Sequence, residues 1–129
     1  MTDMTAEELL ELYAAGKRDF SAINLIGVNL SGFNLSEITF TCAELAQSNL
    51  IGIKLQRANL RGANLYGSGL LDADLTEADL RDAILENTDF SGANLKGAIL
   101  DDAIKDAVLE DTIMPDGQIV TYYPWEIPN

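Results

Sequence analysis

A large hydrophobic residue recurs at every fifth position along most of the chain. From Phe20 to Leu100, all seventeen positions spaced by five are leucine or phenylalanine. These two residue types make up 23 of the 129 residues, so independent placement does not explain the run. A period of five matches neither an α-helix, which turns every ~3.6 residues, nor a strand, whose side chains alternate. The pattern therefore predicts a chain that turns every five residues.

Four such turns close a square coil of twenty residues, and successive coils stack through backbone pairing with a rise of ~4.8 Å. The large hydrophobic residues then point inward and align in columns. The expected core stacks are Phe20, Phe40, Leu60, Leu80 and Leu100, with Leu65, Leu85 and Phe90 in other columns. This arrangement predicts a continuous core running the length of a rod.

The remaining positions of the repeat agree with this geometry. Two residues before the hydrophobic position, small residues fit a crowded interior; they are alanine at 43, 58, 63, 73, 78, 83, 93 and 98. One residue before it, Asn and Asp favour turns through side-chain hydrogen bonds to the backbone; they occupy 24, 29, 34, 49, 59, 64, 74, 79, 89 and 94. Two residues after it, glycine permits tight bends; it occupies 27, 32, 52, 62, 67, 92 and 97.

The motifs ANL at 58–60 and 93–95 and ADL at 78–80 resemble the A(D/N)LXX signature of the pentapeptide-repeat family. The resemblance covers residues 18–114. It implies an all-β fold, a right-handed quadrilateral β-helix or solenoid of about five coils. We expect an N-terminal helical cap at 1–17 and a C-terminal capping tail at 115–129 on either side of the repeats.

Both ends of a solenoid expose core and unpaired backbone, so they need covering. At the start, Thr5 and Glu8 form a capping box, Met4 and Leu9 form a hydrophobic staple, and Gly16 is a stop signal. We therefore expect a helix over residues 6–15, whose face of Ala6, Leu9, Leu10 and Tyr13 covers the first coil. At the other end, Tyr122, Tyr123, Trp125 and Ile127 form an aromatic and apolar cluster. This cluster is either the second cap or a dimer contact.

Three irregularities interrupt the repeat. Bulky Ile23, Val28, Phe33 and Ile38 fill small-residue positions of the first coil, as does Ile53 in the second, which indicates a filled end or, alternatively, a cavity for an apolar ligand. One inward column contains Val28, Ser48, Ser68 and Thr88. We expect the hydroxyls of the two serines and the threonine to bond to nearby carbonyls. After Leu100 the pattern returns only at Leu109 and Met114, so one residue is lost near Ile104 and Lys105. We expect a bulge-like adjustment there.

The composition offers little catalytic chemistry. The chain has no histidine, and its one cysteine, Cys42, follows Phe40 by two positions, where we expect an inert surface thiol. The adjacent Asp101 and Asp102 either bind a divalent cation weakly or, as the acidic composition favours, form a solvated surface. We therefore expect a protein that is not an enzyme, with no catalytic residues, no metal site and no cofactor.

The net charge of −13 disfavours direct binding to nucleic acid or to an anionic membrane. The acidic start of the chain is unlike a signal peptide, and we expect a cytoplasmic protein. Residues 72–116 hold 13 acidic and 3 basic residues, a net charge of −10. This acidic end is either a solubilising surface or a DNA mimic. The DNA mimic is the alternative that the resemblance supplies, because one branch of the family is thought to bind the basic saddle of DNA gyrase.

Outward apolar residues suggest a different kind of surface. The twenty-residue repeat places Ile26, Ala46 and Tyr66 in one outer column and Ile51 and Leu71 in the next. Most other outer positions carry polar, charged or glycine residues, so this cluster stands out. We interpret these five residues as a candidate interaction patch for an unidentified protein partner or for self-association. Scattered surface apolar residues without function are the alternative. A homodimer through this patch or through the C-terminal tail is a further alternative.

Overall fold

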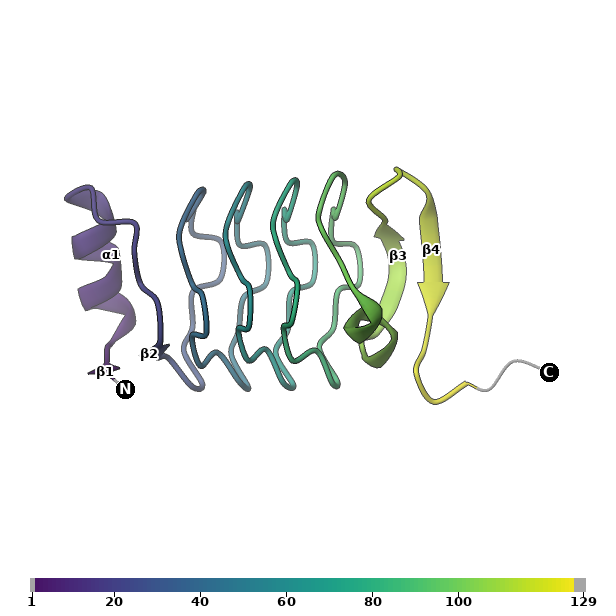
Figure 1. The fold of residues 1–129 in the computed structure, drawn as a ribbon, viewed down its shortest axis with the longest axis horizontal. Helices are drawn as coiled ribbons and strands as arrows, with labels where there is room; N and C mark the ends of the chain where they lie inside the picture. The colour runs from purple at the N-terminus through teal and green to yellow at the C-terminus, as the bar shows by residue number, and fades with distance from the viewer. Residues whose placement is uncertain (1, 127–129) are drawn as a thin grey trace.

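The computed structural model describes residues 2–126 and shows a straight rod of stacked coils (Figure 1). Its named elements are β1 (Thr2–Asp3), α1 (Ala6–Ala14), β2 (Ile23–Asn24), η1 (Asp102–Asp106), β3 (Leu109–Ile113) and β4 (Ile119–Tyr122). Between β2 and η1, the coils are joined by single parallel bridges rather than long strands. The N-terminal helix and the C-terminal hairpin lie at opposite ends of the rod (Figure 1).

The coils pair in a register of twenty residues, and each coil has four bridged sides. One ladder joins Asn24, Glu44, Asn64 and Ile84, and the next begins with Asn29 and Asn49. The backbone amides of the core residues from Phe20 to Leu80 each donate to a carbonyl in the following coil; that of Leu50 donates to the carbonyl of Gly69 at 2.8 Å. These bonds pair the buried backbone groups of successive coils, as a buried backbone requires.

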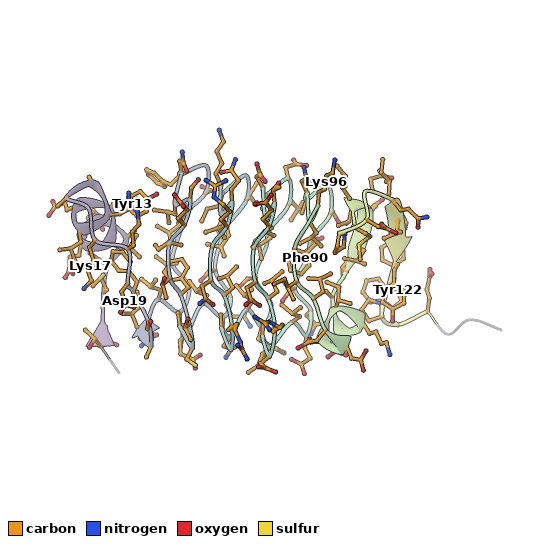
Figure 2. All side chains as sticks on the ribbon, turned by 45° about the horizontal axis from the view of Figure 1, so that its top comes forward. Tyr13, Lys17, Asp19, Phe90, Lys96 and Tyr122 are labelled. Atoms are coloured by element: carbon orange, nitrogen blue, oxygen red, sulfur yellow. The ribbon has the colours of Figure 1, made fainter. Side chains whose placement is uncertain are left out.

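The core is formed by the residues at the five-residue positions, which point into the rod (Figure 2). Phe20, Phe40, Leu60, Leu65, Leu80, Leu85 and Phe90 are each at most 1% exposed. The alanines between them are buried too, and their small size leaves room for the leucines of adjacent sides. Leu100 is only partly buried, because the coil leaves its regular path directly after it.

The corners share one backbone conformation whatever their side chains. The sixteen residues that stand two after the core positions Phe20 to Leu95 all have φ between 55° and 74°. Nine of these sixteen residues are not glycine, although the left-handed region disfavours a Cβ atom. The fold therefore imposes this strain at each turn, and glycine relieves it at seven positions.

At the N-terminal end, Thr5 is the N-cap of α1, which begins at Ala6, and the capping box with Glu8 is present. The helix ends at Ala14, one residue before the predicted boundary, with Ala15 as its C-cap. Leu9 is fully buried in the core, and the Tyr13 hydroxyl donates to the carbonyl of Ser36 at 2.7 Å. β1 pairs in parallel with β2, so the chain before the helix also contacts the first coil.

The prediction that Phe33 fills the interior of the first coil is wrong. Its side chain is 44% exposed, whereas Ile23, Ile38 and Ile53 are buried as expected and Val28 is half-buried. Positions 53, 73 and 93 of the same column hold isoleucine and alanine, which are smaller than phenylalanine. A phenylalanine at this position is therefore too large for the interior space that the isoleucine and alanines of the later coils fill.

The loss of one residue after Leu100 is confirmed, but the predicted bulge at Ile104 and Lys105 is a 3₁₀ helix, η1. The Asp101 side chain caps this helix by accepting from the Ala103 amide at 3.1 Å. Beyond η1 the bridges join residues nineteen apart, as between Asp89 and Val108. β3 then pairs antiparallel with β4, and a register shift between Leu109 and Thr112 marks a bulge there instead.

Candidate interaction surface

The apolar edge, which we define as Ile26, Ala46, Ile51, Tyr66 and Leu71, is assembled by the coil register. The Gln47 amide donates to the Tyr66 carbonyl at 2.7 Å, which stacks Tyr66 beside Ala46 in adjacent coils. The Gly52 amide donates to the Leu71 carbonyl at 2.8 Å, which stacks Leu71 beside Ile51. Backbone pairing therefore holds these side chains in two neighbouring columns.

The apolar edge is open to solvent. Ile26 is 58% exposed, Ile51 is 44% exposed and Tyr66 is 41% exposed. Ala46 and Leu71 are half-buried. Apolar area exposed in adjacent coils on a rigid backbone is suited to binding, because little conformational entropy is lost when a partner covers it.

Gly69 lies beside the column of Ile51 and Leu71 and leaves space that these two side chains can cover. Asn49 and Asp89 occupy the equivalent positions in the coils before and after, and Gly69 is the residue between them. A Cβ atom on Gly69 would lie 3.6 Å from Cδ1 of Leu71 and 3.9 Å from Cγ1 of Ile51. Both side chains therefore lean over the glycine, which adds no polar group to the edge.

The repeat pattern did not identify two exposed isoleucines of the regular coils, Ile84 and Ile99. Ile84 is 44% exposed and bridges to Asn64, directly beside the column of Tyr66. Ile99 is 47% exposed and bridges to Asp79 on a different side of the rod. Each replaces the Asn or Asp that normally precedes the core residue. An isoleucine at this outward position is the sequence signal that could have identified both as exposed. Ile84 extends the apolar surface next to the edge.

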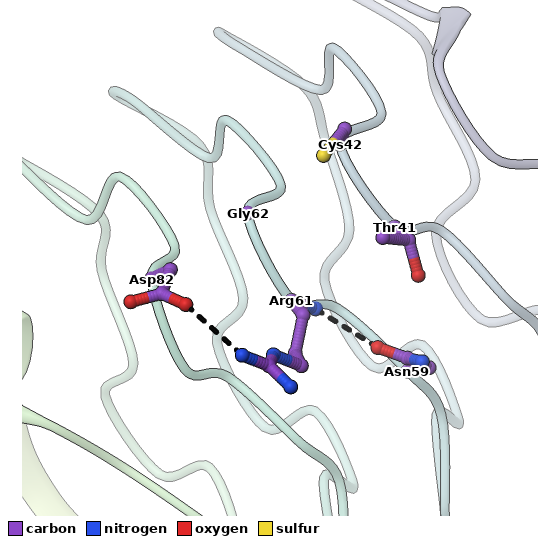
Figure 3. A pocket seen from close by; sticks show the side chains of 6 residues that line it. All are labelled: Thr41, Cys42, Asn59, Arg61, Gly62 and Asp82. Carbon is purple, nitrogen blue, oxygen red and sulfur yellow. Dashed lines mark hydrogen bonds and ion pairs between the residues drawn. The ribbon is translucent and has the colours of Figure 1, made fainter.

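A second surface is polar and lies on the side that carries Arg61 and Arg81. A surface hollow of about 470 Å³ is lined by Thr41, Cys42, Asn59, Arg61, Gly62 and Asp82 (Figure 3). Cys42 is exposed, and its Sγ atom lies 3.0 Å from the position of a Cβ on Gly62. Arg61 in this hollow already contacts Asp82 at 3.3 Å.

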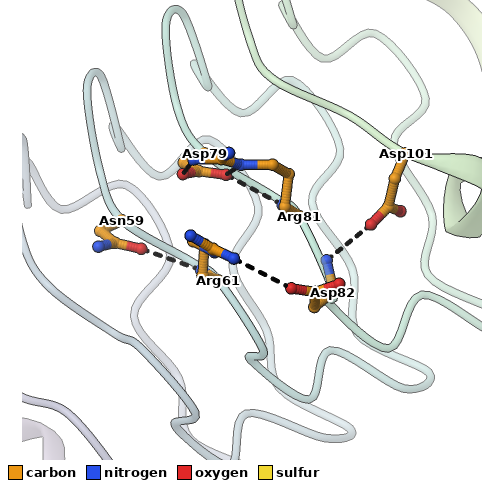
Figure 4. A network of polar contacts seen from close by, with 6 residues as sticks. All are labelled: Asn59, Arg61, Asp79, Arg81, Asp82 and Asp101. Carbon is orange, nitrogen blue, oxygen red and sulfur yellow. Dashed lines mark hydrogen bonds and ion pairs between the residues drawn. The ribbon is translucent and has the colours of Figure 1, made fainter.

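The carboxylates around the hollow are engaged in local contacts (Figure 4). The Arg81 guanidinium hydrogen-bonds to Asp79 and holds the pKa of that carboxyl below its usual value. The amide of Asp82 donates to Asp101 at 2.7 Å, and this bond with that of Ala103 lowers the pKa of Asp101. Within residues 2–126, no three potential ligands lie close enough to form a metal site. Asp102 contacts Lys105 at 3.8 Å.

The C-terminal aromatic residues have separate environments. Tyr122 in β4 packs against the core. Tyr123 stacks on Trp125 with ring centroids 5.2 Å apart, and Trp125 is 67% exposed. Ile127, the last member of the predicted cluster, lies outside the described residues. The cluster therefore contributes one side chain to the end of the core and presents another to solvent.

The fold defines a four-sided parallel β-solenoid whose candidate site is an exposed edge. The sequence matches the family described as pentapeptide repeats, in eight copies over residues 19–57, 43–82 and 73–104. The protein belongs to the pentapeptide-repeat family, whose members form right-handed β-helices. No curated protein matches the sequence. Neither helix within residues 2–126 has the length and apolar content required to cross a membrane.

Solved structures of pentapeptide repeat proteins are similar to this chain. A pentapeptide repeat protein from the thylakoid lumen of Arabidopsis thaliana is 27% identical, with a TM-score of 0.60 over 78% of this chain and 65% of that one. HetL of Nostoc sp. strain PCC 7120, involved in heterocyst differentiation regulation, is 23% identical, with a TM-score of 0.36 over 91% of this chain and 100% of that one. The chain thus spans 65% of the Arabidopsis protein.

Proposed function

We propose that this pentapeptide-repeat protein is a non-enzymatic, cytoplasmic interaction module that binds a protein partner through the apolar edge. The observation that carries the proposal is the exposure of Ile26, Ile51 and Tyr66 in neighbouring columns of a rigid solenoid. Burying such a surface favours association by about 25 cal/mol for each Å² of apolar area. The absence of histidine from the sequence is consistent with a role in binding.

The test compares wild type with the double variant Tyr66→Asp/Leu71→Asp in a pull-down from cell lysate. Both side chains point outward from regular positions, so we expect the variant to keep the circular dichroism spectrum of wild type. A partner that survives washing at high salt with wild type and is lost with the variant supports the proposal. Equal capture by both proteins contradicts it. Thr41→Asp/Gln56→Asp, at outward positions of the other two sides, adds the same charge and is the matched control.

A second function is favoured by the charge distribution. Residues 72–116 carry 13 acidic and 3 basic residues, so one end of the rod has a net charge of −10. This end is suited to mimic DNA and to bind a DNA-binding enzyme such as DNA gyrase. Salt separates the two functions, because screening weakens a charged contact far more than an apolar one. A basic partner released by salt and unaffected by Tyr66→Asp/Leu71→Asp would favour mimicry.

Self-association is the third possibility, through the apolar edge or through the C-terminal tail. Trp125 and Ile119 are each 67% exposed at the C-terminal end of the described residues. Light scattering of wild type, Trp125→Ser and Tyr66→Asp/Leu71→Asp distinguishes the two surfaces. A dimer lost only with Trp125→Ser would assign the contact to the tail, and one lost only with the double variant would assign it to the edge.

A further inference from the structure

The four sides of the rod differ in their charge. Two sides meet at the apolar edge, and we call them the acidic sides. They consist of residues 23–27, 43–47, 63–67 and 83–87, followed by residues 28–32, 48–52, 68–72 and 88–92. Their charged residues are Glu44, Asp72, Glu86 and Asp89, and they contain no lysine or arginine. Their net charge is therefore −4.

The other two sides, which we call the mixed-charge sides, hold the remaining residues between 19 and 100. Their acidic residues are Asp19, Glu37, Asp74, Glu77, Asp79 and Asp82, and their basic residues are Lys54, Arg57, Arg61, Arg81 and Lys96. Six acids and five bases give a net charge of −1. Every basic residue of the regular coils thus lies away from the apolar edge.

Ion pairing follows the same division. In the described part of the chain, the ion pairs of the regular coils all lie on the mixed-charge sides: Arg57 with Glu37, Arg61 with Asp82, and Arg81 with Asp79. Two carboxylates of the acidic sides accept hydrogen bonds from uncharged donors. Glu44 accepts from the Asn64 amide group at 2.9 Å, and Asp89 accepts from the Ser91 hydroxyl at 2.6 Å.

Two exposed carboxylates border the apolar edge. Glu86 is the next residue in the column of Tyr66, since the Gly67 amide donates to the Glu86 carbonyl at 3.0 Å. Asp72 follows Leu71 directly, and its Oδ1 atom fills the space that a Cβ on Gly92 would occupy. Neither Asp72 nor Glu86 has an ion-pairing neighbour among the residues of the acidic sides. A partner that covers Tyr66 and Leu71 therefore places its adjacent side chains beside two unpaired carboxylates.

We propose that the partner of the apolar edge is a protein segment whose apolar side chains are followed by lysine or arginine. This inference rests on the proposed function of the edge and adds the chemistry of its partner. Apolar side chains of the segment contact Ile51, Tyr66 and Leu71, and its cations reach Asp72 and Glu86. Partial removal of water by the apolar contact strengthens the attraction between these charges.

The probe for this inference is a synthetic amphipathic peptide of leucine and lysine, and its binding to the full chain is measured by fluorescence anisotropy. Asp72→Asn/Glu86→Gln removes the two bordering charges. Asp19→Asn/Glu77→Gln is the matched control, because it removes two exposed carboxylates of the mixed-charge sides that form no ion pair in the described residues, and it changes the net charge equally. A peptide of leucine and glutamate tests the sign of the charge. Tyr66→Ser/Leu71→Ser tests the apolar contact alone.

We expect Asp72→Asn/Glu86→Gln to weaken binding of the leucine and lysine peptide about fivefold, as two exposed ion pairs predict. The control pair should weaken it less than about twofold, a screened long-range effect. Equal weakening by both pairs would overturn the inference, since total charge alone would then determine binding. Equal binding of the leucine and glutamate peptide would overturn it as well.

The variants separate this inference from the function on which it rests. Loss of binding with Tyr66→Ser/Leu71→Ser, without any effect of Asp72→Asn/Glu86→Gln, would keep the apolar edge as the binding surface and overturn the basic partner. Binding that is insensitive to Tyr66→Ser/Leu71→Ser would reject the apolar edge itself and, with it, the proposed segment.

Discussion

The guanidinium of Arg81 donates two hydrogen bonds to the carboxylate of Asp79, from Nε to Oδ1 at 3.0 Å and from Nη2 to Oδ2 at 2.6 Å. The two residues are separated by a single core leucine, Leu80. The Arg81 backbone amide also donates to Asp79 at 3.1 Å. The Asp79 carboxylate therefore accepts from the Arg81 backbone at the turn and also forms a bidentate ion pair with the Arg81 guanidinium.

This contact predicts a dependence of stability on pH. The hydrogen bonds from Arg81 lower the pKa of Asp79 in the folded state, so its contribution is present above the pKa of the unfolded chain. The contribution is lost as the pH falls through the folded value. Asp79→Asn should reduce the free energy of unfolding by about 1 kcal/mol at neutral pH. The difference from wild type should shrink in acid, measured by urea denaturation.

Glu86→Gln is the control for this prediction, because it removes an exposed carboxylate for which the described residues show no ion pair. It should lower the free energy of unfolding less than Asp79→Asn does. A difference between Asp79→Asn and wild type that stays constant from neutral to strongly acidic pH would contradict the assigned role of Arg81.

Backbone strain at the corners is testable with two glycines. Gly52 has a φ of 67° and open space around its missing Cβ, so Gly52→Ala isolates the cost of the left-handed conformation. We expect a loss of about 1 kcal/mol in the free energy of unfolding. Gly69 lacks a left-handed φ and has only ordinary contacts at the Cβ position, so Gly69→Ala should be neutral or stabilising by about 0.5 kcal/mol. Equal losses in thermal denaturation would refute this account.

The column of buried hydroxyls contributes through hydrogen bonds to the preceding coil, as the sequence predicts. The Ser68 hydroxyl donates to the Leu45 carbonyl at 2.6 Å, and the Thr88 hydroxyl donates to that of Leu65 at 2.7 Å. Ser68→Ala should cost about 1 kcal/mol in chemical denaturation. Ser31→Ala removes an exposed hydroxyl that bonds to Asn29, and it should cost less than about 0.5 kcal/mol. Similar costs would show that burial of the bond is irrelevant.

The N-terminal helix should stabilise the first coil through one side chain. Leu9 is fully buried, whereas Leu12 in the same helix is 38% exposed. Leu9→Ala should lower the free energy of unfolding by about 2–5 kcal/mol, because it opens a cavity between α1 and the coil. Leu12→Ala should lower it by less than about 1 kcal/mol. Hydrogen exchange of the first coil provides the local measurement, and unchanged exchange with Leu9→Ala would contradict the role of α1.

The candidate surface was only partly predictable. The register of twenty residues was sufficient to place Tyr66 beside Ala46 and Leu71 beside Ile51, because columns follow directly from the repeat. The repeat wrongly assigned Phe33 to the interior, and it made no assignment for Ile84. Their exposure depends on the neighbours that each coil actually has. Likewise, the residue lost after Leu100 was evident, but its accommodation in η1 depends on the Asp101 cap.

The sequence by itself determined the period, the core positions and the location of every corner, because each five-residue unit repeats the same local geometry. It also determined which side chains share a column. The tertiary structure alone decided which of them are exposed and which form ion pairs, since these properties arise between coils and at the ends of the rod. The pairing of Arg61 with Asp82, across 21 residues of sequence, is one example. The carboxylates of Asp72 and Glu86, beside Leu71 and Tyr66, are the contrasting example: the described residues show no ion pair for either of them.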